Sequence, residues 1–517
     1  MTSRIASRGC VPIARSSLRR TLLAPPRRTQ LFSQLAASLS GLQPHFDYKY
    51  IRNHKDALAI NAHNRNIHGI NFDVIVEHHQ VLADLDHQIN QARNQRNDLG
   101  RQIGAMKRKQ QHVLASPASN TDSNSAPTSA ETLVDKARQV REQINELEHR
   151  KATIQQALLS ETAKVPNTTH PTTPIGAADQ ARLVKQVKSA AGQGRHPLRD
   201  HVELCKMHDL VDFQAGANVV GTSFYYLQRE GALLELALVQ YAVQMALAHG
   251  FSPVLAPDLV RQEVVHGCGF QPRKDEASQT YYVSPFHPTD STDPADPKIP
   301  PPPPSAQPPL CLTATAEIPL AGKFMNQLLP LHQVPQKLVA FGHCFRAEAG
   351  AHGADTRGLY RVHQFSKVEL FAVVPPQQSD AMLEEIRQLQ EAIVTGLGLG
   401  YRVLDMPTEE LGASAYKKYD IEAWMPGRNA WGEISSASNC TDYQARRLNI
   451  RCRSSQGPVE FAHTLNGTAC AIPRLIIAIL ETFQQADGTI PLPKALHPWL
   501  HGITQIPGHQ PLASQQQ

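Results

Sequence analysis

One short stretch of this chain, residues 342–371, holds side chains that could bind a nucleotide. They are Arg346, Glu348, Arg361, Phe365 and Glu369. Apolar residues on either side favour two strands, and the glycines between them favour a hairpin loop. Arg346 and Glu348 are predicted two apart on the first strand, and Arg361, Phe365 and Glu369 four apart on the second, so each set should share a face. Arginine grips phosphate oxygens and a ring stacks on a base, so this surface suits a nucleotide with a cationic partner. The alternative is a hairpin with a charged outer face.

A third arginine, Arg474, also favours a phosphate. It falls in the first turn of a predicted helix with Pro473 near its start, after a predicted strand that carries Asn466, Gly467 and Thr468. A helix is electrically positive at that end, so a cation there is unfavourable until an anion binds beside it.

Periodicity predicts the elements that must carry these residues. Apolar spacing predicts a helix over 233–246, a strand over 251–255 and an amphipathic helix over 383–397. Residues 284–310 are rich in proline, which lacks a backbone donor, so they are expected to form an exposed extended insertion. A proline-binding partner is the less favoured explanation of this insertion.

Heptad spacing predicts two long helices earlier in the chain, which the polar residues 116–129 separate. Two such helices should fold back as an antiparallel coiled-coil hairpin, with Arg96 and Lys151 as the breaks in its apolar seam. Basic side chains on its faces can neutralise RNA phosphates, although a dimerisation coiled coil is the alternative. The seam residues are Leu82, Leu85, Ile89, Ala92, Arg96, Leu99, Ile103 and Met106 in the first helix, and Leu133, Ala137, Val140, Ile144, Leu147, Lys151, Ile154 and Leu158 in the second.

Composition limits the class of protein. A chain of 517 residues suggests about three domains, and its hydrophobic fraction of 41% is enough for a large core. The net charge of +5 permits a nucleic-acid partner without requiring one. The eight cysteines include no C-x-x-C pair, which indicates reduced thiols. No apolar run approaches the ~20 residues that span a bilayer, so no membrane partner is expected.

The N-terminus differs from the rest of the chain. No Asp or Glu precedes Asp47, while seven arginines lie among Ser, Thr, Ala and Leu. Such a composition is typical of an organelle transit peptide, so residues 1–45 are predicted to be a mitochondrial one. A basic disordered tail that contacts RNA is the alternative.

Several stretches resemble the seryl-tRNA synthetases, a family of class II aminoacyl-tRNA synthetases. The hairpin reads F-R-A-E and then R-V-H-Q-F-S-K-V-E, which resembles the family's motif 2, and the Asn466–Arg474 stretch resembles motif 3. The helix and strand over 233–255 resemble motif 1, which forms the dimer interface. T-A-E, E-I-S-S and the segment Asp47–Arg52 also match family patterns. The departures are the proline insertion, Cys268 where threonine is usual, and an arm tip rich in Ser and Asn.

The resemblance implies an α+β fold, in which helices flank the antiparallel β-sheet of a class II synthetase and an antiparallel two-helix coiled-coil arm precedes it. It divides the chain into a disordered transit peptide (1–45), a tRNA-binding arm domain (46–178), a catalytic domain (179–505) and a disordered tail (506–517).

The implied reaction joins L-serine to ATP as seryl-adenylate and then transfers serine to the 3′ end of tRNA(Ser). Thr315 and Glu317 are expected on one strand face, and Glu369 is expected to accept from the substrate hydroxyl. For Glu433–Ser436 the alternative is an ordinary strand with a polar edge. The implied catalytic residues are Arg346, Glu433 and Arg474; the serine pocket is Thr315, Ala316, Glu317, Arg346, Glu369, Asn466 and Thr468; the ATP site is Arg346, Ala347, Glu348, Val362, His363, Gln364, Phe365, Glu433, Ile434, Ser435, Ser436 and Arg474; and Mg²⁺ is held by Glu433 and Ser436.

The implied assembly is a homodimer in the mitochondrial matrix. Two other classes stay open: a catalytically inactive synthetase-like protein that binds RNA or a partner, and a ligase that charges a carrier protein. Loss of Arg346, Glu369 or Arg474 would indicate the first, and all three are present. Relatives of the second class lack the helical arm.

Overall fold

The computed structural model describes residues 42, 44–114, 127–189, 197–270, 279–283, 309–348, 357–453 and 457–508. These ranges belong to one compact unit of the chain. The predicted transit peptide lies outside them except for Leu42, Pro44 and His45. The backbone N–H of His45 donates to the carbonyl of Arg446 over 2.8 Å, so the chain is already attached to the catalytic region at that residue.

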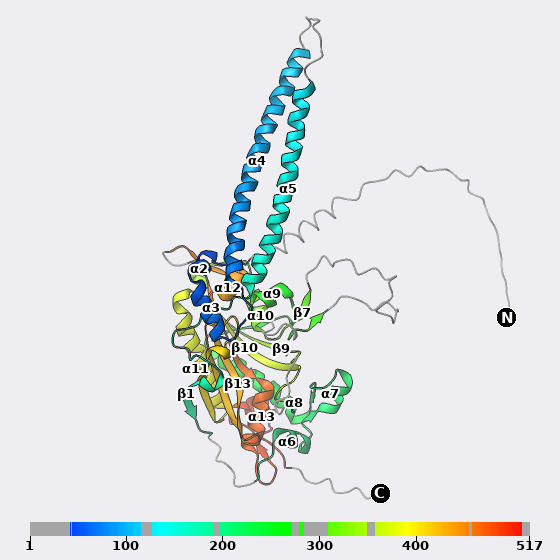
Figure 1. Ribbon diagram of the computed structural model, residues 1–517. Coiled ribbons are helices and arrows are strands. Elements are labelled where there is room, and N and C mark those ends of the chain that lie inside the picture. Colours follow the sequence, from blue (N-terminus) through cyan, green and yellow to red (C-terminus); the bar gives the residue numbers. More distant parts are fainter. Residues whose placement is uncertain are drawn as a thin grey trace, which may run out of the picture. The chain divides into compact units, whose positions relative to one another are not determined.

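An eight-stranded sheet carries the catalytic region (Figure 1). Its strand order is β1-β11-β12-β13-β16-β10-β9-β4, and each neighbouring pair is antiparallel except β4 with β9. This confirms the antiparallel sheet that the resemblance implied. The bounds are β1 (Arg182–Val187), β4 (Ser252–Leu255), β9 (Gln336–Phe345), β10 (Gln364–Val374), β11 (Tyr401–Asp405), β12 (Lys417–Met425), β13 (Ala430–Asn439) and β16 (His463–Ala471).

Helices flank both faces of this sheet, which explains the apolar run at the end of β10. Leu370 and Ala372 pack with α8, α11 and α13, while Phe371 and Val373 pack with α9, α10 and α12. Because side chains alternate along a strand, burial on both faces requires consecutive apolar residues. The bounds are α8 (Arg229–Ala248), α9 (Gln262–Gly267), α10 (Glu317–Gly322), α11 (Ser379–Gly396), α12 (Tyr443–Leu448) and α13 (Ile472–Phe483).

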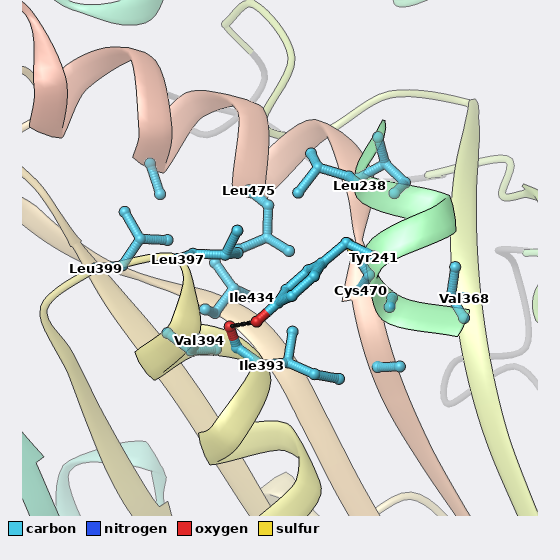
Figure 2. Packing of buried hydrophobic residues seen from close by; sticks show 14 of the residues in the cluster. Leu238, Tyr241, Val368, Ile393, Val394, Leu397, Leu399, Ile434, Cys470 and Leu475 are labelled. Atoms are coloured by element: carbon cyan, nitrogen blue, oxygen red, sulfur yellow. Dashed lines mark hydrogen bonds between the residues drawn. The ribbon is translucent and has the colours of Figure 1, made fainter. Parts of the chain in front are cut away.

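Tyr241 links α8 to α11 inside the larger cluster (Figure 2). Its hydroxyl donates to the carbonyl of Ile393 over 3.0 Å, and burial raises its pKa to about 12. Contrary to the expectation from sequence, α8 is long and apolar enough to cross a membrane by composition alone. Leu234 and Leu238 of α8 are fully buried in this cluster, so α8 is a core helix.

Two long helices, α4 (Phe72–Leu114) and α5 (Pro127–Ala163), lie side by side before the sheet region (Figure 1). Arg93 lies 2.8 Å from Glu148 and Lys151 lies 2.5 Å from Asp86, so the helices are antiparallel, as predicted. The middle of the predicted apolar seam is also confirmed, because Ala92, Leu99, Val140 and Ile144 form one buried cluster, and Arg96 is exposed. The connecting residues 115–126 lie outside the described ranges.

A buried arginine joins the N-terminal helices to the catalytic region. Arg65 follows α2 (Tyr48–Asn53) and α3 (Lys55–Asn64) and is 2% exposed. Its guanidinium donates to the carbonyls of Asn167 over 2.7 Å and Ala415 over 2.9 Å, and also to that of Gly412. Five planar donors suit such a set of backbone acceptors.

Two predicted boundaries need correction. The proline insertion was expected over 284–310, but Leu310 is in β7, which pairs with β6 and β5. The tail was expected from 506, but Ile506 is buried in β18, which pairs with β17. In both cases an apolar residue at one end of the predicted segment pairs with another strand in a small β-sheet. The minor elements are α6 (His201–Met207), α7 (Phe213–Val219), β2 (Val211–Asp212), β3 (Tyr226–Leu227), β5 (Leu259–Arg261), β6 (Tyr282–Val283), β7 (Leu310–Leu312), β8 (Leu328–Leu329), β14 (Arg451–Arg453), β15 (Val459–Phe461), β17 (Ile490–Pro491) and β18 (Gln505–Ile506).

Candidate active site

One cleft brings together most of the residues predicted to bind ATP. Its walls come from the β9–β10 hairpin, from β13 and β16, and from the start of α13. Basic, acidic, hydroxyl and aromatic side chains therefore face one space, as the sequence predicted. The predicted residues that line it are Arg346, Glu348, Val362, Phe365, Glu433, Ile434, Ser435, Ser436, Thr468 and Arg474.

Arg474 is in the first turn of α13, as predicted, and its guanidinium is fixed in the cleft. Its Nη1 donates to the backbone carbonyl of Glu433 over 2.8 Å and lies 3.3 Å from the Glu433 carboxylate. Its Nε donates to the carbonyl of Tyr360, whose ring centroid lies 4.6 Å from the guanidinium carbon. These contacts offset the unfavourable place of a cation at the start of a helix and leave the arginine ready for an anion.

Arg346 and Glu348 reach the cleft from the segment that follows β9 and not from a strand, which corrects the sequence prediction. Strand β9 ends at Phe345, and Arg346 adds one more backbone bond, from its N–H to the carbonyl of His363 over 2.8 Å. The Arg346 guanidinium lies 5.1 Å from the centre of the Phe365 ring, and Glu348 pairs with Arg361 over 3.1 Å. Arg361 precedes β10 and so shares no strand face with Phe365.

Glu433 is poised to stay ionised in the cleft. Burial alone would raise the pKa of its carboxyl, but the charges of Lys418, Arg474 and Arg346 outweigh burial and hold the pKa below its usual value. Hard cations prefer ionised oxygen ligands. Across the ranges that the structure describes, no group of three or more His, Cys, Asp or Glu side chains could hold a metal by itself.

The residues predicted to bind serine gather around a lysine that was not predicted. The Nζ atom of Lys367 donates to Thr315 Oγ1 over 2.9 Å and to Thr468 Oγ1 over 3.5 Å, and it also contacts the Glu369 carboxylate. All four side chains are more than nine-tenths buried. The signal in the sequence was the position of Lys367 between Phe365 and Glu369 on one face of β10.

The T-A-E stretch is a helix start and not a strand, which is a second correction. Strand β7 ends at Leu312, and α10 begins at Glu317. The backbone N–H of Glu317 donates to Thr315 Oγ1 over 3.3 Å, and Pro319 falls in the first turn, where its missing N–H costs nothing. Glu317 is buried, and its Oε1 accepts from Gln444 over 2.6 Å.

Burial and then the like charge of Glu369 raise the pKa of the Glu317 carboxyl to about 7. A substrate ammonium is attracted only to the ionised form, so we expect the apparent KM for serine to rise about tenfold per pH unit below that value. The folded form also binds this proton more tightly than the unfolded chain, so the contribution of Glu317 to stability falls as pH rises towards 7. The KM for ATP serves as control, and Glu317→Gln should remove the pH dependence of the serine KM. A serine KM that is flat across this range in the unaltered protein would contradict the expectation.

Some predicted residues do not line the cleft, and the buried Thr315, Glu317 and Glu369 are among them. Ala347 donates from its backbone to Gln279, and Ala316 is buried beside α10. The His363 ring packs on Phe224, and Gln364 lines a separate cleft on the other face of β10. Asn466 donates from Nδ2 to Cys440 Sγ over 3.5 Å. The side chains of His363 and Gln364 therefore do not line the predicted ATP site.

A buried His–Glu pair, which was not predicted, supports one wall of the cleft. His201 Nε2 accepts from the backbone N–H of Leu359 over 3.2 Å, so its proton lies on Nδ1, which faces Glu481 at 3.2 Å. Leu359 and the adjoining Tyr360 line the cleft, and Tyr360 bonds Arg474. His201 thus positions the backbone that holds Arg474.

Comparison with known proteins agrees with this geometry. A family model for the tRNA synthetase class II core domain (G, H, P, S and T) matches residues 305–483, and one for the seryl-tRNA synthetase N-terminal domain matches residues 46–169. The serine–tRNA ligase of Treponema denticola is 40% identical over 456 residues, which are 88% of this chain and 98% of that protein. The mitochondrial serine–tRNA ligase of Mus musculus is 42% identical over 381 residues, which are 73% of this chain and 69% of that protein.

A solved structure extends the likeness to three dimensions. The seryl-tRNA synthetase from Pyrococcus horikoshii, complexed with ATP, is 31% identical with a TM-score of 0.73, and the match covers 90% of this chain and all of that one. The matches to the Treponema denticola and Pyrococcus horikoshii proteins cover 88% and 90% of this chain, and nearly all of each of those proteins. The chain therefore belongs to the seryl-tRNA synthetase family.

Proposed function

We propose that this protein is a mitochondrial serine–tRNA ligase, which activates L-serine with ATP and transfers it to tRNA(Ser). The observation that carries the ligase function is the cleft that Arg346, Phe365 and Arg474 line together. Lys367 lines the same cleft and contacts the buried carboxylate of Glu369. Little covalent work falls to the protein, so catalysis is positioning and charge stabilisation.

The arginines and the phenylalanine hold ATP in this proposal. Arg346 binds the α-phosphate and the serine carboxylate, and Arg474 binds the γ-phosphate, as forked cations suit. Phe365 stacks on adenine and Glu348 accepts from its amino group. The cation–ring contact between Arg346 and Phe365 supports this assignment, because it brings the proposed phosphate-binding and base-stacking side chains together.

Glu433 and Ser436 would hold Mg²⁺ together with the ATP phosphates. Both line the cleft, and the lowered pKa of Glu433 suits an ionised ligand. Two protein oxygens are enough, because Mg²⁺ commonly takes its other ligands from phosphates and water. The ion would neutralise phosphate charge.

Serine lies in the pocket of Thr315, Glu317, Glu369 and Thr468. Glu317 faces the substrate ammonium, and Glu369 accepts from its hydroxyl. Asn466 is assigned to the same pocket because it lies two residues before Thr468 on β16, where it bonds Cys440.

The arm domain (46–178) binds the tRNA, and the catalytic domain follows from 179. Arg101 and Arg138 on the arm are 81% and 78% exposed, and cations so placed can neutralise phosphates. A homodimer through α8 and β4 is supported by the exposure of Leu236 at 61% and Leu255 at 89%. A molecular mass in solution that corresponds to one chain would contradict the proposed homodimer.

The deciding experiment is aminoacylation of purified mitochondrial and cytosolic serine tRNAs by protein that lacks about its first 40 residues, the inferred transit peptide. Charging of the mitochondrial tRNAs supports the proposal. Charging of the cytosolic tRNAs alone would overturn the mitochondrial assignment. Charging of neither, by folded protein, would favour an inactive synthetase-like protein that binds RNA.

A further inference from the structure

We propose that Lys367 is a positioning residue that sets the hydrogen-bond polarity of the amino-acid pocket and thereby selects a side-chain hydroxyl. The inference rests on the proposed function, because it assigns specificity to the same pocket. A lysine ammonium has three donors and no acceptor. Lys367 directs them to Thr315, Thr468 and Glu369, so no donor remains for a substrate.

The contacts of Lys367 leave Thr315 with one role. A hydroxyl accepts through two lone pairs and donates through one hydrogen. Thr315 Oγ1 accepts from Lys367 Nζ over 2.9 Å and from the backbone N–H of Glu317 over 3.3 Å. Both lone pairs are therefore occupied, and the threonine can only donate to a ligand.

Glu369 has the opposite role. The adjoining ammonium keeps the pair neutral at a site where both side chains are more than nine-tenths buried. An ionised carboxylate has acceptor capacity for several hydrogen bonds and no donor. Thr315 and Glu369 thus offer a donor and an acceptor around one ammonium.

A side-chain hydroxyl is the group that satisfies both, since it donates to Glu369 and accepts from Thr315. A methyl group satisfies neither, which excludes alanine. A side-chain ammonium can donate but not accept, and Lys367 repels it. Without Lys367, the pocket would hold a lone carboxylate that favours such a cation.

The test is ATP–pyrophosphate exchange by the full chain with serine, alanine and 2,3-diaminopropionate, at a pH where the side chain of the last is charged. We expect Lys367→Met to lower kcat/KM for serine about 100-fold, the scale of lost hydrogen bonds to a charged group. The ratio of kcat/KM for diaminopropionate to kcat/KM for serine should rise. The KM for ATP should stay within about threefold, because Lys367 leaves no donor for the nucleotide. A folded Lys367→Met protein with unchanged selectivity would overturn the inference.

Lys417→Met is the matched control. Lys417 is an equally buried lysine that bonds Thr172 Oγ1 over 2.9 Å and Asp405 over 3.3 Å, away from the cleft. The Lys417→Met substitution should lower the unfolding temperature without changing the selectivity for serine over diaminopropionate. If Lys367→Met does not fold, the unaltered protein still tests the inference. Efficient activation of diaminopropionate by the unaltered protein would contradict it. Absence of serine-dependent exchange in the unaltered protein would instead defeat the proposed function.

Discussion

Arg474→Ala is expected to slow serine-dependent ATP–pyrophosphate exchange about a thousandfold, the scale on which a fixed arginine stabilises phosphoryl charge. The guanidinium is already oriented by two carbonyls, the Glu433 carboxylate and the Tyr360 ring. Little reorganisation is then needed when phosphate charge develops. Exchange at saturating serine is the measurement, and Arg474→Lys should recover only part of the loss because lysine lacks the planar fork.

Arg428 supplies the control for Arg474. Its guanidinium carbon lies 3.7 Å from the centre of the same Tyr360 ring, but the residue does not line the cleft. Arg428→Ala therefore removes a comparable stacking contact, and we expect exchange within about threefold of normal, as for surface changes away from a site. Equal losses in the two variants would show that Tyr360 packing, and not phosphate binding, is what Arg474 supplies.

Regular patterns in the sequence predicted the parts of the fold that repeat. Heptad spacing predicted both arm helices, because a two-helix contact repeats the same burial along its length. The β9–β10 hairpin was predicted from apolar residues on each side of a glycine-rich loop, and its strands pair as expected. The start of α13 was predicted from Pro473 and the apolar stripe after it.

The residues whose secondary structure was predicted wrongly lie just after the end of a strand, in a connecting segment or at the start of a helix. The alternating letters T-A-T-A-E read as a strand, yet the backbone of Glu317 bonds the Thr315 hydroxyl and begins α10. Such a start depends on a local hydrogen bond that competes with the sheet, and residue types alone do not decide that competition. Arg346 was placed on β9 for a similar reason, since strand pairing ends one residue earlier.

The residues that the sequence did not reveal act through partners far away in the chain. Lys367 meets Thr315 and Thr468, and His201 meets Leu359 and Glu481. No spacing rule connects positions separated by 52 or 158 residues. Buried polar groups must find partners, but only the folded chain shows which ones.

Glu369→Gln is expected to lower kcat/KM for serine about ten-thousandfold. This is the scale on which a site built to bond a hydroxyl discriminates against a ligand that leaves its polar groups unpaired. The amide keeps the volume of the carboxylate but leaves the buried Lys367 without its anionic partner. Glu369→Ala should lose as much, and the KM for ATP should change little in either variant. Glu391→Gln is the control, since Glu391 of α11 is also buried and does not line the cleft. Glu391 pairs with Lys185 of β1 and with Arg387 of α11. Its loss should appear as a lower unfolding temperature with serine selectivity intact. Serine-dependent exchange that survives unchanged in Glu369→Ala would remove this carboxylate from the pocket and, with it, the physical reason for rejecting alanine.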